Sequence, residues 1–200
     1  MCAHLILIPQ DELERIIEDV KNHLKAEQPD IAASYQDVYP RAKVHVAVSN
    51  EGRLDVQVKQ WGYPVTWQKD VVFNTKMETA LGSKPTMWRD SIQSRRCLVP
   101  SFGFFEPHWK DTHLSPKTGK PIKDQYYFQL PGMDIVWMAG VFADEHFSVM
   151  TTVPNQWMEK IHPRMPVVLH PDELDIWLHG NYSGLADRAR IQMESCKMAG

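Results

Sequence analysis

Hydrophobic and polar residues alternate along the middle of the chain, and this pattern predicts strands. Residues 44–48 and 54–58 place a hydrophobic side chain at every second position, and the turn-forming run 49–52 separates them. Such alternation on both sides of a short turn is typical of a β-hairpin. Further strands are expected at residues 4–8, 71–73, 95–106, 125–130, 135–142, 146–153 and 165–169.

Helical periodicity marks the two ends of the chain. Residues 11–27 place apolar side chains three and four positions apart with charges between them, which predicts an amphipathic helix. Shorter helical elements are expected at 85–95, 155–160 and 171–179, and a last helix at 185–197 within the C-terminal segment 181–200.

Two segments show neither the alternation of a strand nor the periodicity of a helix. The polar run 108–124 contains prolines and a glycine and predicts an exposed excursion, and residues 61–67 predict an aromatic loop. With strands in the middle and helices at the ends, we expect an α+β fold. It would be a single domain over residues 1–200, built on a curled, mainly antiparallel, barrel-like sheet flanked by helices.

Composition narrows the classes of protein that remain. The formal net charge is −3, so nucleic acid would have to bind in a local basic groove, and broad binding to duplex is not expected. Three cysteines are an odd number without framework spacing, which favours a reduced, cytoplasmic protein. No window approaches the ~20 apolar residues of a membrane span. We expect no membrane association, and a monomer.

The dipeptide Met1-Cys2 carries the first candidate chemistry. If Met1 is removed, Cys2 presents an α-amine and a thiol on one carbon framework, and such an aminothiol can trap an aldehyde as a five-membered thiazolidine. The α-amine has a reference pKa of about 8, against about 10.4 for lysine, so it is far more nucleophilic near neutral pH. The alternative is a buried, inert cysteine. Cys2 and His4 lack a second pair at zinc-ligand spacing, so neither a metal nor a cofactor is expected.

Three further side chains could carry chemistry, each with an alternative role. Glu106 follows an apolar run, where burial raises a carboxyl pKa and suits it to acid/base work, but it could instead pair with Arg96. His162 lies in a segment whose backbone is restricted by prolines, which suits a functional side chain that must be held in place. The alternative is an ordinary loop histidine with its hydrogen bonds satisfied. Asn74 could orient a substrate or simply cap a turn.

These residues fall in short sequence blocks with a fixed order along the chain. The blocks are Met1-Cys2, Trp61-Gly62, Asn74-x-x-x-Glu78-Thr79, Arg96-Cys97-Leu98-Val99-Pro100, Gly103-Phe104-Phe105-Glu106, Thr151-Thr152 and His162-x-Arg164-Met165-Pro166. Over residues 1–180 the chain resembles the SOS response-associated peptidase (SRAP) family, whose members begin Met-Cys and carry these blocks at similar separations.

The resemblance implies a sensor of abasic sites in single-stranded DNA that acts in the DNA damage (SOS) response. In the family, loss of the first methionine exposes a cysteine that forms a covalent thiazolidine crosslink to the ring-opened sugar, with associated autoproteolytic peptidase and lyase activity. By motif, Cys2 would be the nucleophile and Asn74 would orient the sugar or the Cys2 backbone. Glu106 would act as acid/base and process Met1. His162 would assist ring opening.

The same blocks imply the contacts to DNA. Basic side chains would meet phosphates, and aromatic rings would stack on bases or wedge at the lesion, with core packing as the alternative role of each ring. The expected DNA-contacting residues are Lys76, Arg89, Arg164, His4, Thr151, Trp61, Trp67, Phe104 and Phe105.

The chain departs from the family pattern at several positions, which are Ala3-His4 in place of Gly-Arg, Lys76 in place of arginine, Pro107-His108 inserted before Trp109, and Pro163 in place of an acidic residue. These changes affect the expected DNA affinity and leave the four catalytic matches in place. Two other functions stay open. One is a cysteine peptidase or amidase with an N-terminal nucleophile, and the other is a non-catalytic module that binds single strands.

Overall fold

The computed structural model describes residues 2–21 and 36–198. Its helical elements are α1 (Gln10–Lys21), α2 (Met77–Ala80), α3 (Arg89–Ser94), η2 (Pro171–Glu173), α4 (Leu174–Leu178) and η3 (Tyr182–Ala186). Its strands are β1 (His4–Leu7), β2 (Gln36–Val38), β3 (Lys43–Asn50), β4 (Arg53–Trp61), β5 (Asn74–Lys76), β6 (Arg96–Ser101), β7 (Phe104–Leu114), β8 (Pro121–Gln129), β9 (Val136–Ala143), β10 (His146–Thr152), β11 (Met165–Pro166), β12 (Val168–Leu169) and β13 (Glu194–Lys197). Strands dominate over short helices, and the predicted α+β class is confirmed.

The larger sheet curls until its hydrogen bonds close a ring. Its strand order is β11-β10-β4-β3-β6-β9-β12, and β10 also pairs with β9. The ring therefore runs through β10, β4, β3, β6 and β9. Only short stretches close it, since β4 meets β10 at two register positions and in parallel. The curled sheet that the sequence predicts is confirmed, although its closure is too irregular for a regular barrel.

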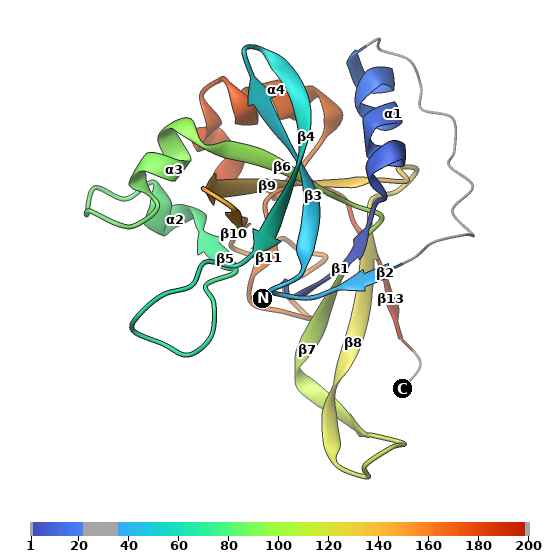
Figure 1. The fold of residues 1–200 in the computed structure, drawn as a ribbon. Helices are drawn as coiled ribbons and strands as arrows, with labels where there is room; N and C mark the ends of the chain where they lie inside the picture. The colour runs from blue at the N-terminus through green and yellow to red at the C-terminus, as the bar shows by residue number, and fades with distance from the viewer. Residues whose placement is uncertain (1, 22–35, 199–200) are drawn as a thin grey trace.

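The smaller sheet has the order β13-β8-β7-β1-β2. In Figure 1, β7 and β8 extend beyond the rest of the molecule as a two-stranded ribbon, while β1 and β2 run beside the near end of β7. This sheet connects the N-terminal strand to the middle of the chain, because β1 pairs with β7 at His4↔Phe105 and Leu5↔Phe104.

The predicted hairpin forms as β3 and β4, and its turn explains the short connection. Glu51 and Gly52 both have positive φ, 50° and 78°. Two consecutive residues in this region are the signature of a type I′ turn, whose twist matches that of the paired strands. Asn50 and Arg53 then pair across the turn, and the register continues to Lys43↔Gln60.

Two clusters of buried side chains form the core. One lies under α1, α3 and α4 and includes Leu13, Ile92 and Trp177. The other lies inside the curled sheet and includes Trp61 and Cys2. Cys2 is fully buried, so the dipeptide that opens the chain is carried into the interior.

Several sequence predictions are wrong in their details. The segment 108–124 is largely exposed, as predicted, but it forms a paired ribbon, since Thr112, His113 and Leu114 pair with residues 121–123. The expected last helix, 185–197, is absent, and its end is β13, which pairs antiparallel with β8 because the exposed edge of β8 accepts another strand. The strand expected at 71–73 lies at 74–76 instead.

Other predictions are shifted or fall partly outside the described residues. Trp61 ends β4, so the aromatic loop begins after it. The predicted strand at 165–169 is split into β11 and β12. The first helix is confirmed as far as Lys21, and residues 22–27 of that prediction lie outside the described residues.

Candidate active site around Cys2

Strand β1 positions Cys2 beside β7. Because the two strands run antiparallel with His4 opposite Phe105, the residues before His4 lie next to those after Phe105. Glu106 is the next residue of β7, and its side chain points to the same face as that of Phe104, which belongs to the Cys2 core cluster. The register of this one strand pair therefore brings Cys2 to Glu106.

A buried serine fixes β1 in this place. The Ser101 hydroxyl accepts a hydrogen bond from the Ile6 backbone N–H at 3.0 Å and donates to the Ile6 carbonyl at 2.9 Å. Gly103 follows, and a Cβ there would lie 2.3 Å from the Tyr127 ring. Only glycine allows this close approach of the chain, so the Gly103–Glu106 block is tied to the packing of β8 against β7.

Asn74 reaches Cys2 from the other sheet. It opens β5, which runs parallel to β10 with Asn74 opposite Val149. Its side-chain amide donates to the Cys2 carbonyl at 2.8 Å. Its Oδ1 is buried and accepts no hydrogen bond from the described residues. The amide thus holds the backbone of Cys2 and leaves a buried acceptor at the same place.

Glu106 and His162 form the other side of the site. Glu106 is fully buried, and burial raises its pKa to about 7. One oxygen of its carboxyl lies 3.8 Å from His162 Nδ1. Burial lowers the pKa of His162, so its ring is neutral at neutral pH. A carboxyl whose pKa lies near the working pH is suited to both giving and taking a proton.

The surroundings of the Cys2 thiol change its pKa. Burial raises its pKa well above the ordinary value, and the nearby charge of Glu106 raises it further. The thiol is therefore protonated at neutral pH, and its reaction requires a base to take the proton. Asn74, Glu106 and His162, with Cys2, are here called the Cys2 cluster. The structure brings together all four residues that the sequence motifs match.

The model of the family described as SOS response associated peptidase (SRAP) matches residues 1–198. The chain belongs to the SRAP family.

Named relatives agree with this assignment. The abasic site processing protein YoqW of Bacillus subtilis is 28% identical over 192 residues, which cover 90% of this chain and 80% of that protein. YedK of Escherichia coli, also named an abasic site processing protein, is 27% identical over 196 residues, covering 94% and 82%. The crystal structure of a phage-related protein from Bordetella bronchiseptica matches with a TM-score of 0.71 and 20% identity, covering 100% of this chain and 95% of that one. At that identity the structural match shows the shared fold.

Several residues expected to contact DNA are buried in this SRAP protein. Trp61 is fully buried, and its indole N–H donates to the Phe73 carbonyl at 2.9 Å. Phe104 stacks on Phe128 inside the same core cluster. Phe105 is 9% exposed, and Thr151 is fully covered. No base could reach these side chains in this arrangement, and core packing explains the large rings at Trp61 and Phe104.

The guanidinium of Arg164 makes hydrogen bonds to other groups of the protein. Its guanidinium donates to both carboxylate oxygens of Glu78 and to the Thr151 carbonyl, the last at 2.9 Å. Its backbone N–H and carbonyl both contact the His162 ring. Arg164 therefore anchors the segment that carries His162. These contacts give Arg164 a structural function, and the phosphate contact expected from the sequence stays a prediction.

The remaining predicted contacts divide into exposed and enclosed side chains. Lys76 and Arg89 are exposed, and the Trp67 ring is 67% exposed in the loop after β4. His4 is enclosed, because its ring lies between those of Tyr39 and Phe105 and pairs with Asp37 at 2.9 Å. The exposed side chains, Lys76, Arg89 and Trp67, are placed where a ligand could reach them.

Ser101 is a positioning residue that the sequence did not reveal. A hydroxyl at the end of an apolar run must find a buried partner, which is the only local signal. The partner is Ile6, 95 positions earlier in the chain, and no pattern in the sequence connects the two.

The described part of the chain shows two further negative findings. No helix within it is long and apolar enough to cross a membrane. Nor do its His, Cys, Asp and Glu side chains form a group of three or more that could hold a metal ion.

Proposed function

We propose that this SRAP protein processes abasic sites in single-stranded DNA by forming a covalent crosslink through Cys2 once Met1 has been removed. The observation that supports this most strongly is the juxtaposition at Cys2. The Asn74 amide holds the Cys2 carbonyl, and a buried carboxyl with a pKa of about 7 lies beside the same residue. The names of the relatives point to the same substrate.

The reaction follows from the chemistry of an aminothiol. The α-amine of Cys2 attacks the C1′ aldehyde of the ring-opened deoxyribose, and the resulting carbinolamine loses one water to give an imine. The thiol sulfur then adds to the imine carbon and closes the thiazolidine. One C–N bond and one C–S bond form, one water leaves, the ring nitrogen keeps one hydrogen of the original amine, and the thiol proton restores the acid that protonated the departing hydroxyl.

Each member of the cluster has a role in these steps. Protonated Glu106 gives its proton to the departing hydroxyl, and the carboxylate then takes the proton from the thiol, whose high pKa makes this help necessary. Asn74 fixes the Cys2 backbone, which sets the direction of the amine. Neutral His162 accepts the proton of the C1′ hydroxyl as the C1′–O4′ bond breaks, and gives a proton to O4′, so that the aldehyde and a free hydroxyl result.

A denaturing assay tests this proposal. Protein whose intact mass shows that Met1 is absent is incubated with a single strand that contains one abasic site, and then denatured. We expect a stoichiometric adduct that Cys2→Ala abolishes. Cys196→Ala is the matched control, since Cys196 is an exposed free thiol on β13. An adduct that persists in Cys2→Ala, or is lost in Cys196→Ala, contradicts the proposal.

The peptidase activity in the family description is assigned to the removal of Met1 by the same cluster. In this proposal Glu106, which lies beside Cys2, activates water or the thiol for cleavage of the Met1–Cys2 bond. Glu106→Gln should then retain Met1 on the purified protein, which intact mass reports directly. Complete loss of Met1 from Glu106→Gln would assign the cleavage to another enzyme.

A further inference from the structure

The ribbon formed by β7 and β8 contains an irregular segment close to the Cys2 cluster. Pro107 pairs with Gln125, but the next pair is Thr112 with Lys123. Residues 108–111 therefore lie opposite Asp124 alone, which makes a large, irregular β-bulge. This bulge includes His108 and Trp109 at the position where the chain departs from the family pattern. Bulges often redirect side chains beside functional sites.

Side chains on both strands hold the bulge in one shape. His108 Nδ1 accepts hydrogen bonds from the backbone N–H groups of Lys110 and Asp111, at 3.2 and 2.8 Å. Lys123 Nζ donates to the carbonyls of Trp109 and Lys110, at 2.8 and 3.0 Å. These backbone polar groups of the bulge are thus satisfied within the protein, which makes it a pre-formed element.

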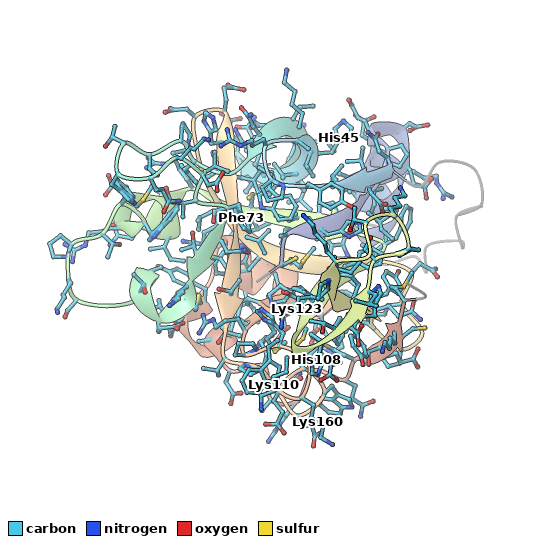
Figure 2. The ribbon with its side chains drawn as sticks, turned by 90° about the horizontal axis from the view of Figure 1, so that it is seen from below. His45, Phe73, His108, Lys110, Lys123 and Lys160 are labelled. Carbon is cyan, nitrogen blue, oxygen red and sulfur yellow. The ribbon has the colours of Figure 1, made fainter. Side chains whose placement is uncertain are left out.

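The bulge presents an aromatic ring and a cation to the outside. The Trp109 ring is 50% exposed, and Lys110 Nζ lies 4.0 Å from its centre. Lys123 contacts the bulge directly, and Figure 2 shows it with His108, Lys110 and Lys160 in the lower part of the view. Acidic residues near the bulge include Asp111, which lies 3.6 Å from His108, exposed Glu159, and Asp124, which is paired with Lys197. Positive charge is in excess.

The bulge is also tied to the segment that carries His162. The Trp109 backbone N–H donates to the Ile161 carbonyl at 2.8 Å. His162 is the next residue, and Glu106 lies three residues before Trp109 on β7. A strand whose sugar enters the Cys2 cluster would therefore pass this surface.

We propose that the bulge binds single-stranded DNA beside the Cys2 cluster, with a base stacked on Trp109 and Lys110 on the neighbouring phosphate. This inference rests on the proposed function. Every base has a π-face, so an exposed tryptophan ring binds a strand without reading its sequence. Lys110 already occupies the ring by a weak cation–π contact, and it can exchange that contact for a phosphate when a base arrives. The local excess of lysines suits a polyanion although the whole chain is acidic.

The test uses an undamaged, fluorescently labelled oligothymidine, which cannot crosslink. Trp109→Ala should weaken its binding by about tenfold, as expected for one lost stacked base, and Trp109→Phe should retain most of the affinity. Lys110→Ala should lower the slope of log affinity against log salt by about 0.7. Quenching of tryptophan fluorescence by unlabelled strand should fall in Trp109→Phe, which folds with a ring in the same place.

Controls lie on the same ribbon beyond the bulge. Leu114 is 68% exposed, and Lys117 is exposed in the turn, so Leu114→Ala and Lys117→Ala should bind like wild type. Equal binding by Trp109→Ala and wild type, or equal losses for Lys117→Ala and Lys110→Ala, would overturn the proposal. The two proposals separate cleanly. A missing abasic adduct with tight oligothymidine binding counts against Cys2 chemistry, and an intact adduct with unchanged Trp109→Ala binding counts against the bulge.

Discussion

The ribbon strands β7 and β8 each carry a buried carboxylate, and the two have opposite properties. Glu106 on β7 is fully buried, and burial raises its pKa to about 7. Asp124 on β8 is 3% exposed, but His113 and Lys197 each lie 2.7 Å from its oxygens. The hydrogen bond from Lys197, followed by that from His113, lowers its pKa below the ordinary value.

The comparison shows that the partners of a carboxylate, as well as its coverage by protein, decide whether it can move a proton at neutral pH. Asp124 is held as a carboxylate by basic side chains and joins β8 to β13 and to β7. For Glu106, burial raises the pKa, and the neighbouring His162 ring is neutral. Glu106 therefore changes protonation in the pH range in which an imine forms and collapses.

The largest expected effect is on the rate of adduct formation. Glu106→Gln, produced with Cys2 as its first residue by cleavage of an N-terminal tag, should form the abasic adduct about 10²–10⁴-fold more slowly, because a positioned proton-transfer group is lost. Single-turnover gel kinetics give the rate. Asp124→Asn is the matched control on the neighbouring strand and should react at the wild-type rate. Equal slowing of both variants would mean that the two carboxylates do not differ in function.

The second effect is on stability, where the same substitution, Glu106→Gln, should be favourable at alkaline pH. A rise in the pKa of Glu106 from 4.5 to about 7 means that the folded state favours its protonated form. Its contribution is fully present below about pH 4.5 and is lost as pH rises through 7, by roughly 3 kcal/mol in all. Glu106→Gln should remove this loss and be more stable than wild type at pH 8. Urea unfolding of both proteins from pH 4.5 to 8 gives the difference, and parallel curves would refute the raised pKa.

Asp124 should behave in the reverse manner. Its folded pKa is lowered, so its contribution is present above the ordinary aspartate pKa and is lost as pH falls through the lower folded value. Asp124→Asn should lower the thermal midpoint at pH 7 by about 2–4 °C, with a shrinking difference at acidic pH. Calorimetry at several pH values measures this, and a difference that grows towards low pH would contradict the assignment.

The smallest effect concerns the anchor of the His162 segment. Arg164→Lys loses the bidentate contact with Glu78 and should slow the adduct about threefold. Glu78→Gln should give a similar loss, and the double variant little more, because both remove one interaction. If Arg164 instead binds phosphate, Glu78→Gln would release it and strengthen DNA binding, which an affinity measurement would show.

The sequence predicts the fold where the pattern is local. The alternation of β3 and β4 with their turn is readable, because the spacing and turn chemistry are contained in residues 43–61. The ribbon at 108–124 is not readable, since its polar, exposed strands bury no face that would produce alternation. Residues 194–197 have the same property, because β13 is exposed along its length and takes its conformation from the edge of β8.

The candidate site likewise contains some residues that the sequence predicts and others that it does not. Motif matching selects Cys2, Asn74, Glu106 and His162, and the structure brings these four residues together, while their catalytic roles stay a proposal. It does not predict the burial of Trp61 or the pairing of Arg164 with Glu78, because both depend on contacts between distant segments. Ser101 and the Trp109 bulge depend on strand register, which the sequence alone does not specify.

The most direct test of the account is the intact mass of the product formed with an abasic single strand, without any reducing agent. We expect a covalent adduct that survives denaturation. Its mass should equal that of the protein lacking Met1 plus that of the oligonucleotide, minus one water. Absence of that species from the wild-type protein, or an adduct that is trapped only by borohydride and persists in Cys2→Ala, would contradict it.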